Sequence, residues 1–271
     1  MRLAISNIAW DTVHDEAVVA LLNRHGLDAI DIAPSKYFPR VAEAQPGEIT
    51  AVRAWWADRG IEITGMQALL FGTTGLNVFG EPAVRQALLQ HLGEVCRIGG
   101  ALGAPRLVFG SPKNRDRSGL GDEETLDIAT AFFRQLGDLA AAQGVVVCLE
   151  PNPPRYGANF MTHSAETAAV VRAVNHPAIR MQFDAGALTM NGEDPAQVLA
   201  DGADLIGHVH ASEPDLLPLG DGSTDHARMA AALRQHLPVH TVCIEMLAAK
   251  GEAPLASIDR AVAAAVLHYG R

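Results

Sequence analysis

Short apolar segments alternate with longer amphipathic segments along nearly the whole of this 271-residue chain. The apolar segments, most of them rich in Val, Ile and Leu, cover residues 3–6, 27–32, 61–67, 106–110, 145–150, 180–184, 206–210 and 241–245. Runs of this length and composition are typical of parallel strands that are buried on both faces. Because an amphipathic segment follows each of them, the sequence predicts eight successive strand–helix units.

Capping and breaking residues mark the helices expected between these strands. Asp11 and Gly26 are expected to bound the first helix, and Gly60 is expected to end the second. Pro82 has the fixed backbone geometry that suits the first turn of the third helix. The fourth helix is expected at 122–143, before Gly144, and the fifth is expected to begin at Ser164 and to end before Pro177. The sixth is expected to begin at Pro195, and the seventh to follow Asp225 as its cap. The eighth is expected at 257–268, with Ser257 as its N-cap.

Eight regular units fit a closed (β/α)8 barrel, the TIM-barrel architecture, better than an open doubly wound sheet. The GxGxxG turn that follows the first strand of a dinucleotide-binding sheet is absent, since SNIAWD stands there. A barrel of this kind uses about 250 residues as one domain. We therefore predict an α/β protein with a single (β/α)8 domain over residues 1–271.

The amino-acid composition and net charge limit the classes of function that this protein can have. With 48% hydrophobic and 19% charged residues, the chain is typical of a soluble globular protein, and no membrane association is expected. The formal net charge of -10 disfavours nucleic acid as a partner. The N-terminal segment lacks the pattern of a secretory signal, so a cytoplasmic location is expected. Cys96, Cys148 and Cys243 are far apart in the sequence and are expected to be reduced thiols.

Polar residues end the last four predicted strands. They are Glu150 in CLEPN, Asp184 in QFDAG, His210 in HVHAS and Glu245 in CIEML. In a parallel barrel the C-terminal ends of the strands form the functional face, and these four ends are neighbours. Three carboxylates and an imidazole suit one divalent ion, Mn²⁺, Mg²⁺, Co²⁺ or Zn²⁺, whose charge relieves the repulsion among the acids.

A second layer of side chains is expected directly beneath this quartet. Residues two positions earlier on each strand point the same way, one layer deeper in the barrel. They are Cys148, Gln182, His208 and Cys243. We expect the two thiols to be small buried side chains and His208 to support the layer above through hydrogen bonds.

Other polar side chains near strand ends are candidate substrate contacts. The set comprises Trp10, Gln67, Lys113, Asn152, Arg155, Tyr156, His208, Glu213 and Asp221. Lys113 and Arg155 carry the charge needed to pair with an anionic group on a substrate. The GDG run at 220–222 places an acid where a phosphate would be repelled, and it is interpreted as a turn before Asp225.

Several of these motifs together resemble the xylose-isomerase-like barrel superfamily, in particular the sugar isomerase/epimerase branch that includes the ketose 3-epimerases. The motifs are LEPN at Glu150, FDAG at Asp184, HVHASE from His210, PLGDG before Asp225, and IEM at Glu245. The resemblance covers essentially the whole chain. It implies that Glu150, Asp184, His210 and Glu245 bind one divalent metal, and that the two glutamates are also the acid/base groups.

The chain departs from the superfamily's patterns at two places. Many members have a histidine three residues after the strand-six aspartate, where Ala187 stands here, and Thr189 is the nearby polar residue that could fill its place. The DNA-repair endonuclease branch has extra histidines after strands three and four, where this chain has Gln67, Gly110 and Ser111. Together with the acidic charge, the second difference argues against cleavage of abasic-site DNA.

One metal site between two carboxylates suits proton transfer next to a carbonyl group. A bound ion stabilises the charge of an enediolate, one glutamate removes a proton, and the other returns one. The expected function is therefore metal-dependent isomerisation or epimerisation of a small carbohydrate. A dehydratase of the 3-dehydroshikimate type and a non-catalytic, metal-dependent sugar-binding protein remain as alternatives, and a homo-oligomer is compatible with the sequence.

Overall fold

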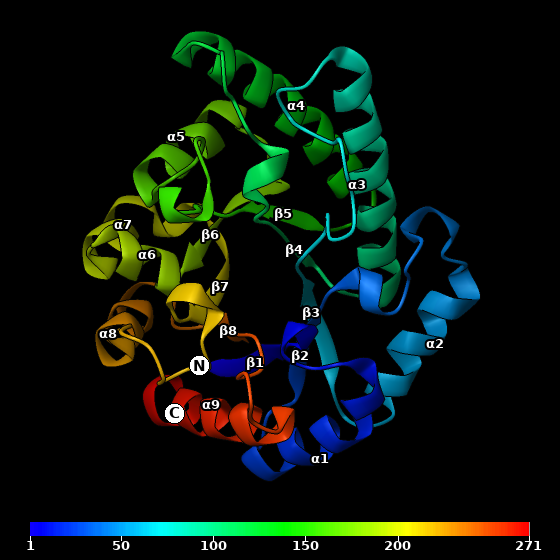
Figure 1. Ribbon diagram of the computed structural model, residues 1–271, viewed down its shortest axis with the longest axis vertical. Coiled ribbons are helices and arrows are strands. Elements are labelled where there is room, and N and C mark those ends of the chain that lie inside the picture. Colours follow the sequence, from blue (N-terminus) through cyan, green and yellow to red (C-terminus); the bar gives the residue numbers. More distant parts are fainter. Residues whose placement is uncertain (271) are drawn as a thin grey trace.

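The computed structural model describes residues 1–270 and contains a closed barrel of parallel strands in the order of the sequence, as predicted (Figure 1). The strands are β1 (Arg2–Ser6), β2 (Ala29–Ile32), β3 (Glu62–Met66), β4 (Arg106–Phe109), β5 (Val146–Leu149), β6 (Ile179–Asp184), β7 (Ile206–Ser212) and β8 (Thr241–Glu245). Parallel pairing of β1 with β8 closes the barrel. All strand C-terminal ends therefore lie at one mouth.

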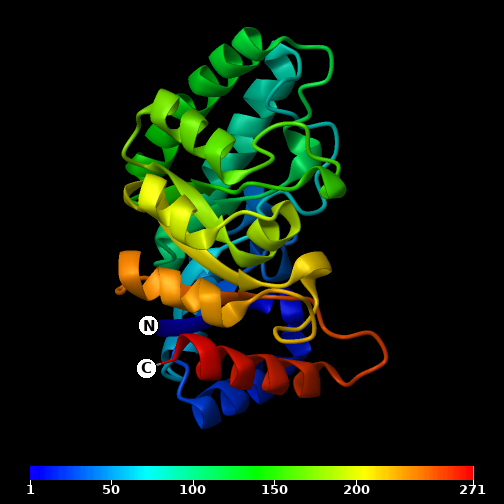
Figure 2. The same ribbon diagram turned by 90° about the vertical axis from the view of Figure 1, so that its left-hand side faces the viewer.

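Helices surround this barrel on the outside (Figure 1). They are α1 (Asp15–His25), α2 (Pro46–Ala57), α3 (Pro82–Leu102), α4 (Asp122–Ala142), α5 (Ser164–Val174), α6 (Ala185–Asn191), α7 (Pro195–Gly202), α8 (His226–His236) and α9 (Pro254–Tyr269). The last helix, α9, packs against both α1 and α8 and so completes the ring. The N-terminus and the C-terminal end of α9 lie side by side in Figures 1 and 2, and the amino group of Met1 donates to the Tyr269 carbonyl oxygen.

Most of the expected helix boundaries are confirmed. Gly26 ends α1 in the left-handed conformation, Pro82 begins α3, and the Asp225 side chain caps α8 by accepting from the backbone N–H of Arg228. The first helix differs, because Asp11 caps a single 3-10 turn and α1 begins at Asp15.

Ser257 is not an N-cap, and that prediction is wrong. The chain enters α9 earlier, with Pro254 in the first position, where its missing N–H removes no helical hydrogen bond. Ser257 lies one turn into the helix, and its hydroxyl donates to the Pro254 carbonyl oxygen.

Strand β6 ends at Asp184, as predicted, but the helix that follows it and the length of β7 differ from expectation. Helix α6 starts directly after Asp184, whose side chain caps it by accepting from the Ala187 N–H at 2.6 Å. Strand β7 continues to Ser212, two residues beyond His210. In the resulting register His210 is level with Asp184, whereas Ser212 is level with Glu245.

The apolar core lies mainly between the barrel and its helices, and includes fully buried side chains such as Trp56 and Tyr269. Inside the barrel, a small cluster of Ala4, Ala29 and Cys243 lies apart from that core. All three cysteines are buried and unpaired with one another, as expected. None of the described helices combines enough length with enough apolar character to cross a membrane.

Candidate metal centre

Four side chains from neighbouring strands converge at the barrel mouth, as the sequence pattern predicts. Glu150 follows β5 directly, Asp184 ends β6, His210 lies within β7, and Glu245 ends β8. One ligand atom from each residue lies within 4.8 Å of the corresponding atom of every other. Gly110 leaves room for this arrangement, because a Cβ atom there would lie 2.0 Å from Glu150 Oε2.

The distances within this quartet fit the ligands of a single ion. His210 Nδ1 lies 3.3 Å from Glu245 Oε2, 3.4 Å from Glu150 Oε1 and 3.7 Å from Asp184 Oδ2. Two ligands that each lie about 2.1 Å from one ion are separated by roughly 3.0 Å in octahedral and 3.4 Å in tetrahedral geometry. A divalent cation can therefore be accommodated with small adjustments of the four side chains.

Hydrogen bonds from outside the quartet hold each carboxylate. Asn152 Nδ2 donates to Glu150 Oε2 at 3.0 Å, and Gln67 Nε2 donates to Glu245 Oε1 at 2.6 Å. The Ser212 hydroxyl donates to Asp184 Oδ2 at 2.9 Å. Outer donors of this kind orient metal ligands.

Two of the carboxylates keep an oxygen turned toward His210. Glu150 Oε1 is buried and makes no hydrogen bond, and Glu245 Oε2 faces the imidazole. A buried anionic oxygen without a hydrogen bond is costly, and a cation in the quartet removes that cost. This observation supports the fit of a metal ion to the donor set.

The electrostatics of the quartet lead to the same conclusion. Burial opposes protonation of His210, yet the charge of Glu245 and the closeness of its ring to all three acids raise its pKa well above the ordinary value. Burial also raises the pKa of Glu245, although His210 counteracts part of the shift. Without an ion the site therefore retains protons, which a divalent cation would displace on binding.

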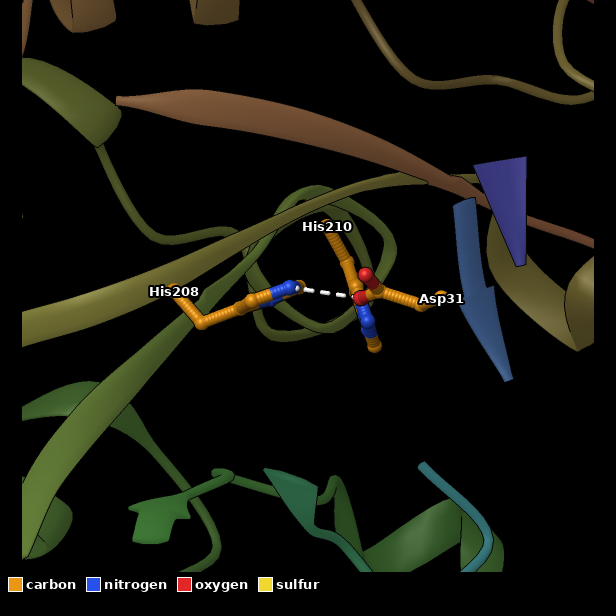
Figure 3. Close-up of side chains that lie close together, drawn as sticks. All are labelled: Asp31, His208 and His210. Carbon is orange, nitrogen blue, oxygen red and sulfur yellow. Dashed lines mark ion pairs between the residues drawn. The ribbon is translucent and has the colours of Figure 1, made fainter. Parts of the chain in front are cut away.

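Below the quartet, Asp31 on β2 forms a buried ion pair with His208 (Figure 3). Asp31 Oδ2 lies 2.7 Å from His208 Nε2, a hydrogen-bond distance that is too short for an ion between the two atoms. The carboxylate also accepts from the Thr64 hydroxyl at 2.9 Å, and Gly65 provides the space, since a Cβ atom there would lie 2.6 Å from Asp31.

The same carboxylate lies close to the His210 ring, as Figure 3 shows. The rings of His208 and His210 are nearly perpendicular, with centroids 5.0 Å apart. On its other side, His208 Nδ1 lies 3.1 Å from the side-chain amide of Gln182. The polar contacts of His208 thus go to Asp31 and Gln182, and its support of the layer above through hydrogen bonds stays a prediction. Sequence reasoning missed Asp31, and the available signal was a lone acid inside the apolar run LDAIDIA.

Arg115 is a second residue that sequence reasoning missed. Its side chain is fully buried, and Nη1 donates to the backbone carbonyl oxygen of Glu150 at 2.7 Å. Burial lowers the pKa of this guanidinium to about 10, although the nearby charges of Glu150 and Glu166 oppose the shift. The chain thus places a buried cation behind the first glutamate of the quartet. In the sequence, nothing distinguishes it from its neighbours in PKNRDR.

The predicted substrate contacts fall into two groups. Gln67, Lys113, Asn152, Tyr156 and Glu213 line the cleft at the barrel mouth. The other four side chains contact other residues of the protein. Trp10 is buried and donates to Asp15, and Arg155 is exposed and pairs with Asp215. His208 pairs with Asp31, and Asp221 pairs with Arg260. Contact with a substrate stays a prediction for the whole set.

Thr189 does not fill the position of the absent strand-six histidine. It lies in α6, where its hydroxyl donates to the Ala185 carbonyl oxygen and contacts Thr224. Ala187 and Met190 of the same helix line the cleft instead. Helix α6 begins directly after Asp184 and leaves no loop long enough to turn Thr189 toward the quartet.

The family model for xylose isomerase-like TIM barrels matches residues 19–265. The chain belongs to this family. This xylose isomerase-like barrel is 31% identical over 107 residues to the L-ribulose 3-epimerase of Methylomonas sp. (strain DH-1). That match covers 40% of the chain and 37% of the relative, so it spans little more than a third of the relative's length.

Solved structures share the whole fold of this xylose isomerase-like barrel. The crystal structure of D-psicose 3-epimerase in the presence of D-fructose matches with a TM-score of 0.82 and 19% identity, and the match covers 100% of both chains. A structure of IOLI protein with a binding zinc atom matches with a TM-score of 0.76 and 16% identity, and the match covers 99% of this chain and 98% of that one.

Proposed function

We propose that this protein is a metal-dependent sugar epimerase of the ketose 3-epimerase type. The observation that carries the proposal is the pair of glutamates at the barrel mouth, each with one oxygen held by a side-chain amide and the other turned into a donor set for one ion. The similarity to an L-ribulose 3-epimerase supports the choice of a ketose substrate.

The residues that would hold the ion are Glu150, Asp184, His210 and Glu245. When bound, a divalent ion supplies Lewis-acid stabilisation of the negative charge that develops on the substrate during proton removal. Mn²⁺, Mg²⁺, Co²⁺ and Zn²⁺ all suit a set of three carboxylates and one imidazole.

The two glutamates perform the proton transfers in this proposal. Glu150 belongs to the end of β5 and Glu245 to the end of β8, so they approach the cleft from strands that are three positions apart in the barrel. Epimerisation needs one base to remove the proton on one face of the reacting carbon and one acid to return a proton on the other face. The amides of Asn152 and Gln67 fix the orientation of the two carboxylates for these steps.

Incubation with Mn²⁺ or Co²⁺ and a panel of ketoses in D₂O tests the proposal. Deuterium is expected at the reacting carbon of the product, because the proton is returned by the second glutamate, whose carboxyl group carries deuterium from the solvent. Conversion without label in the product would contradict proton transfer. Loss of water from the substrate would instead favour the dehydratase, and sugar binding without conversion would favour a binding protein.

A further inference from the structure

The cleft over the glutamate pair has two lobes, one with more polar side chains in its lining than the other. One has a volume of about 460 Å³, and we call it the polar lobe; its lining includes Asn152, Tyr156, Asp184, Ser212 and Glu213. The other has a volume of about 520 Å³, and we call it the apolar lobe; most of its lining is apolar and includes Ile8, Leu69, Leu70, Phe71, Phe109 and Leu247. Polar side chains also reach this lobe, namely Ser35, Lys36, Gln67, Ser111 and Lys113. Glu150, Glu245, Gly110 and Leu216 line both lobes.

Each lobe alone is large enough for a small-molecule group, since ligand pockets measure roughly 300–1,000 Å³. A sugar whose reacting carbon lies between Glu150 and Glu245 finds partners for its hydroxyl groups in the polar lobe. Hydroxyl groups placed against Ile8, Leu70 or Phe109 would lose their hydrogen bonds to water without replacement, which is unfavourable. A monosaccharide in the polar lobe therefore leaves the apolar surface of the other lobe without a matching group.

Leu216 marks the boundary between the lobes, and its backbone is unusual. Its φ angle is 55° and that of Asp215 is 60°, the left-handed region that residues with side chains rarely adopt. Hydrogen bonds hold this conformation: Leu247 N–H donates to the Leu216 carbonyl oxygen at 2.8 Å, and Asp215 N–H donates to the Tyr156 hydroxyl at 2.7 Å. Strain that is held in this way is concentrated at functional sites.

Apolar side chains at the lip of the apolar lobe are turned toward solvent. Phe71 is 75% exposed and Leu247 is 48% exposed. Leu247 lies at the base of the loop between β8 and α9, which projects from the body of the molecule in Figure 2. Exposed apolar side chains that border a cavity are typical of a binding surface.

We propose, on the basis of the epimerase function above, that the substrate is a sugar ketone that carries an apolar substituent. The sugar occupies the polar lobe, with its reacting carbon between the two glutamates. An aryl or alkyl group, linked as an ether or a glycoside, occupies the apolar lobe against Leu70, Phe71 and Leu247. Leu216 separates the two parts of the substrate.

Two matched pairs of probes test this proposal with the Mn²⁺-loaded protein. The first pair is D-fructose and 6-O-benzyl-D-fructose; the second is methyl and phenyl 3-keto-β-D-glucopyranoside. Calorimetry measures binding, and deuterium incorporation from D₂O measures turnover. At least tenfold tighter binding of the aryl member is expected in at least one pair, because its ring leaves water for an apolar surface. Equal or weaker binding of both aryl probes would overturn the proposal.

Substitutions in the apolar lobe test whether the aryl group binds there. Phe71→Ser changes a largely exposed side chain and Leu247→Ser a half-exposed one, so both proteins are expected to fold. Each substitution is expected to reduce the ratio of the two binding affinities, aryl probe over its partner, at least threefold. Leu267→Ser on the outside of α9, where the side chain is 78% exposed, is the matched control and is expected to leave the preference unchanged. An unchanged preference in both lobe variants would count against the apolar lobe.

The two readouts separate this inference from the epimerase function. Tighter binding of an aryl probe without deuterium exchange in any probe supports the apolar lobe and contradicts the epimerase. Exchange in all probes with equal binding within each pair contradicts the apolar lobe and supports the epimerase. A dimer that buries Phe71 and Leu247, detected by sedimentation together with equal binding of the paired probes, would also overturn the proposal.

Discussion

Gln67 Nε2 lies 2.6 Å from Glu245 Oε1, and this contact joins residues 178 positions apart in the sequence. Gln67 follows β3 directly, and Glu245 ends β8, so the hydrogen bond spans the barrel mouth. Glu245 Oε1 is thereby held, while Oε2 faces His210. The residue predicted as a substrate contact therefore also positions one of the two proposed acid/base groups.

Replacement of Gln67 by Leu is expected to lower kcat more than it raises KM. The variant removes a hydrogen bond to a charged group, worth roughly 1.5–3 kcal/mol, which corresponds to about a tenfold to hundredfold loss in rate. Steady-state kinetics on the best ketose measure the effect. The exposed Gln86→Leu on α3 is the control. A change confined to KM would instead indicate simple substrate contact.

Glu150→Gln and Glu245→Gln are each expected to lower kcat at least about a hundredfold, the low end of general acid–base contributions. Both changes keep the size of the side chain and remove its ability to accept a proton. Single-turnover measurements with saturating Mn²⁺ separate this loss from reduced metal affinity. Near-normal rates in both variants would remove the glutamates from the mechanism.

Removal of the metal is expected to abolish turnover, and Mn²⁺ or Co²⁺ is expected to restore it. Asp184→Ala and His210→Ala each delete one donor of the quartet and are expected to lose stoichiometric metal, measured by elemental analysis. Asp127→Ala, an exposed acid on α4, is expected to keep it. Full occupancy in both quartet variants would disprove the assigned site.

The Asp31–His208 pair is expected to contribute strongly to stability. Burial opposes ionisation of Asp31, but the charge and hydrogen bond of His208 lower its pKa overall. Asp31→Asn and His208→Gln each leave one buried partner without its counterpart, so each is expected to lower the free energy of unfolding by roughly 3–5 kcal/mol. In urea denaturation, the double variant should lose clearly less than the sum of the two. Additive losses would show that the pair is not coupled.

The lowered pKa of Glu213 predicts that the folded protein loses stability in acid. Burial opposes its ionisation, yet the hydrogen bonds of His226, Thr224 and Gly220 lower its pKa from the ordinary 4.5 to about 2. Because the pKa is lower in the folded state, the ionised group stabilises the fold above about pH 4.5, and this contribution is lost as the pH falls toward about 2.

Glu213→Gln is therefore expected to be less stable than the parent at neutral pH and to lose less of its stability on acidification. Chemical denaturation between about pH 6 and pH 3 measures both differences. The exposed Glu123→Gln on α4 should follow the parent protein. Parallel stability curves for the parent and Glu213→Gln would contradict the assignment.

Sequence periodicity was sufficient to predict the barrel and the convergence of the quartet. Alternating apolar and amphipathic segments are local patterns, and in a parallel barrel the strand ends meet at one mouth whatever the details of packing. Glu150, Asp184, His210 and Glu245 could therefore be placed together from their positions in the chain alone. Gly26, Pro82 and Asp225 also act locally, and they mark helix boundaries as predicted.

Tertiary structure alone decided which side chains support that quartet. The contacts of Asp31 with His208, of Gln67 with Glu245 and of Arg115 with Glu150 depend on strand register and on packing between residues 35 to 178 positions apart. The extension of β7 past His210 and the division of the cleft at Leu216 are likewise settled by hydrogen bonds to other strands and loops. Local sequence carries no signal for such pairings, because their free energy arises only when distant segments come together.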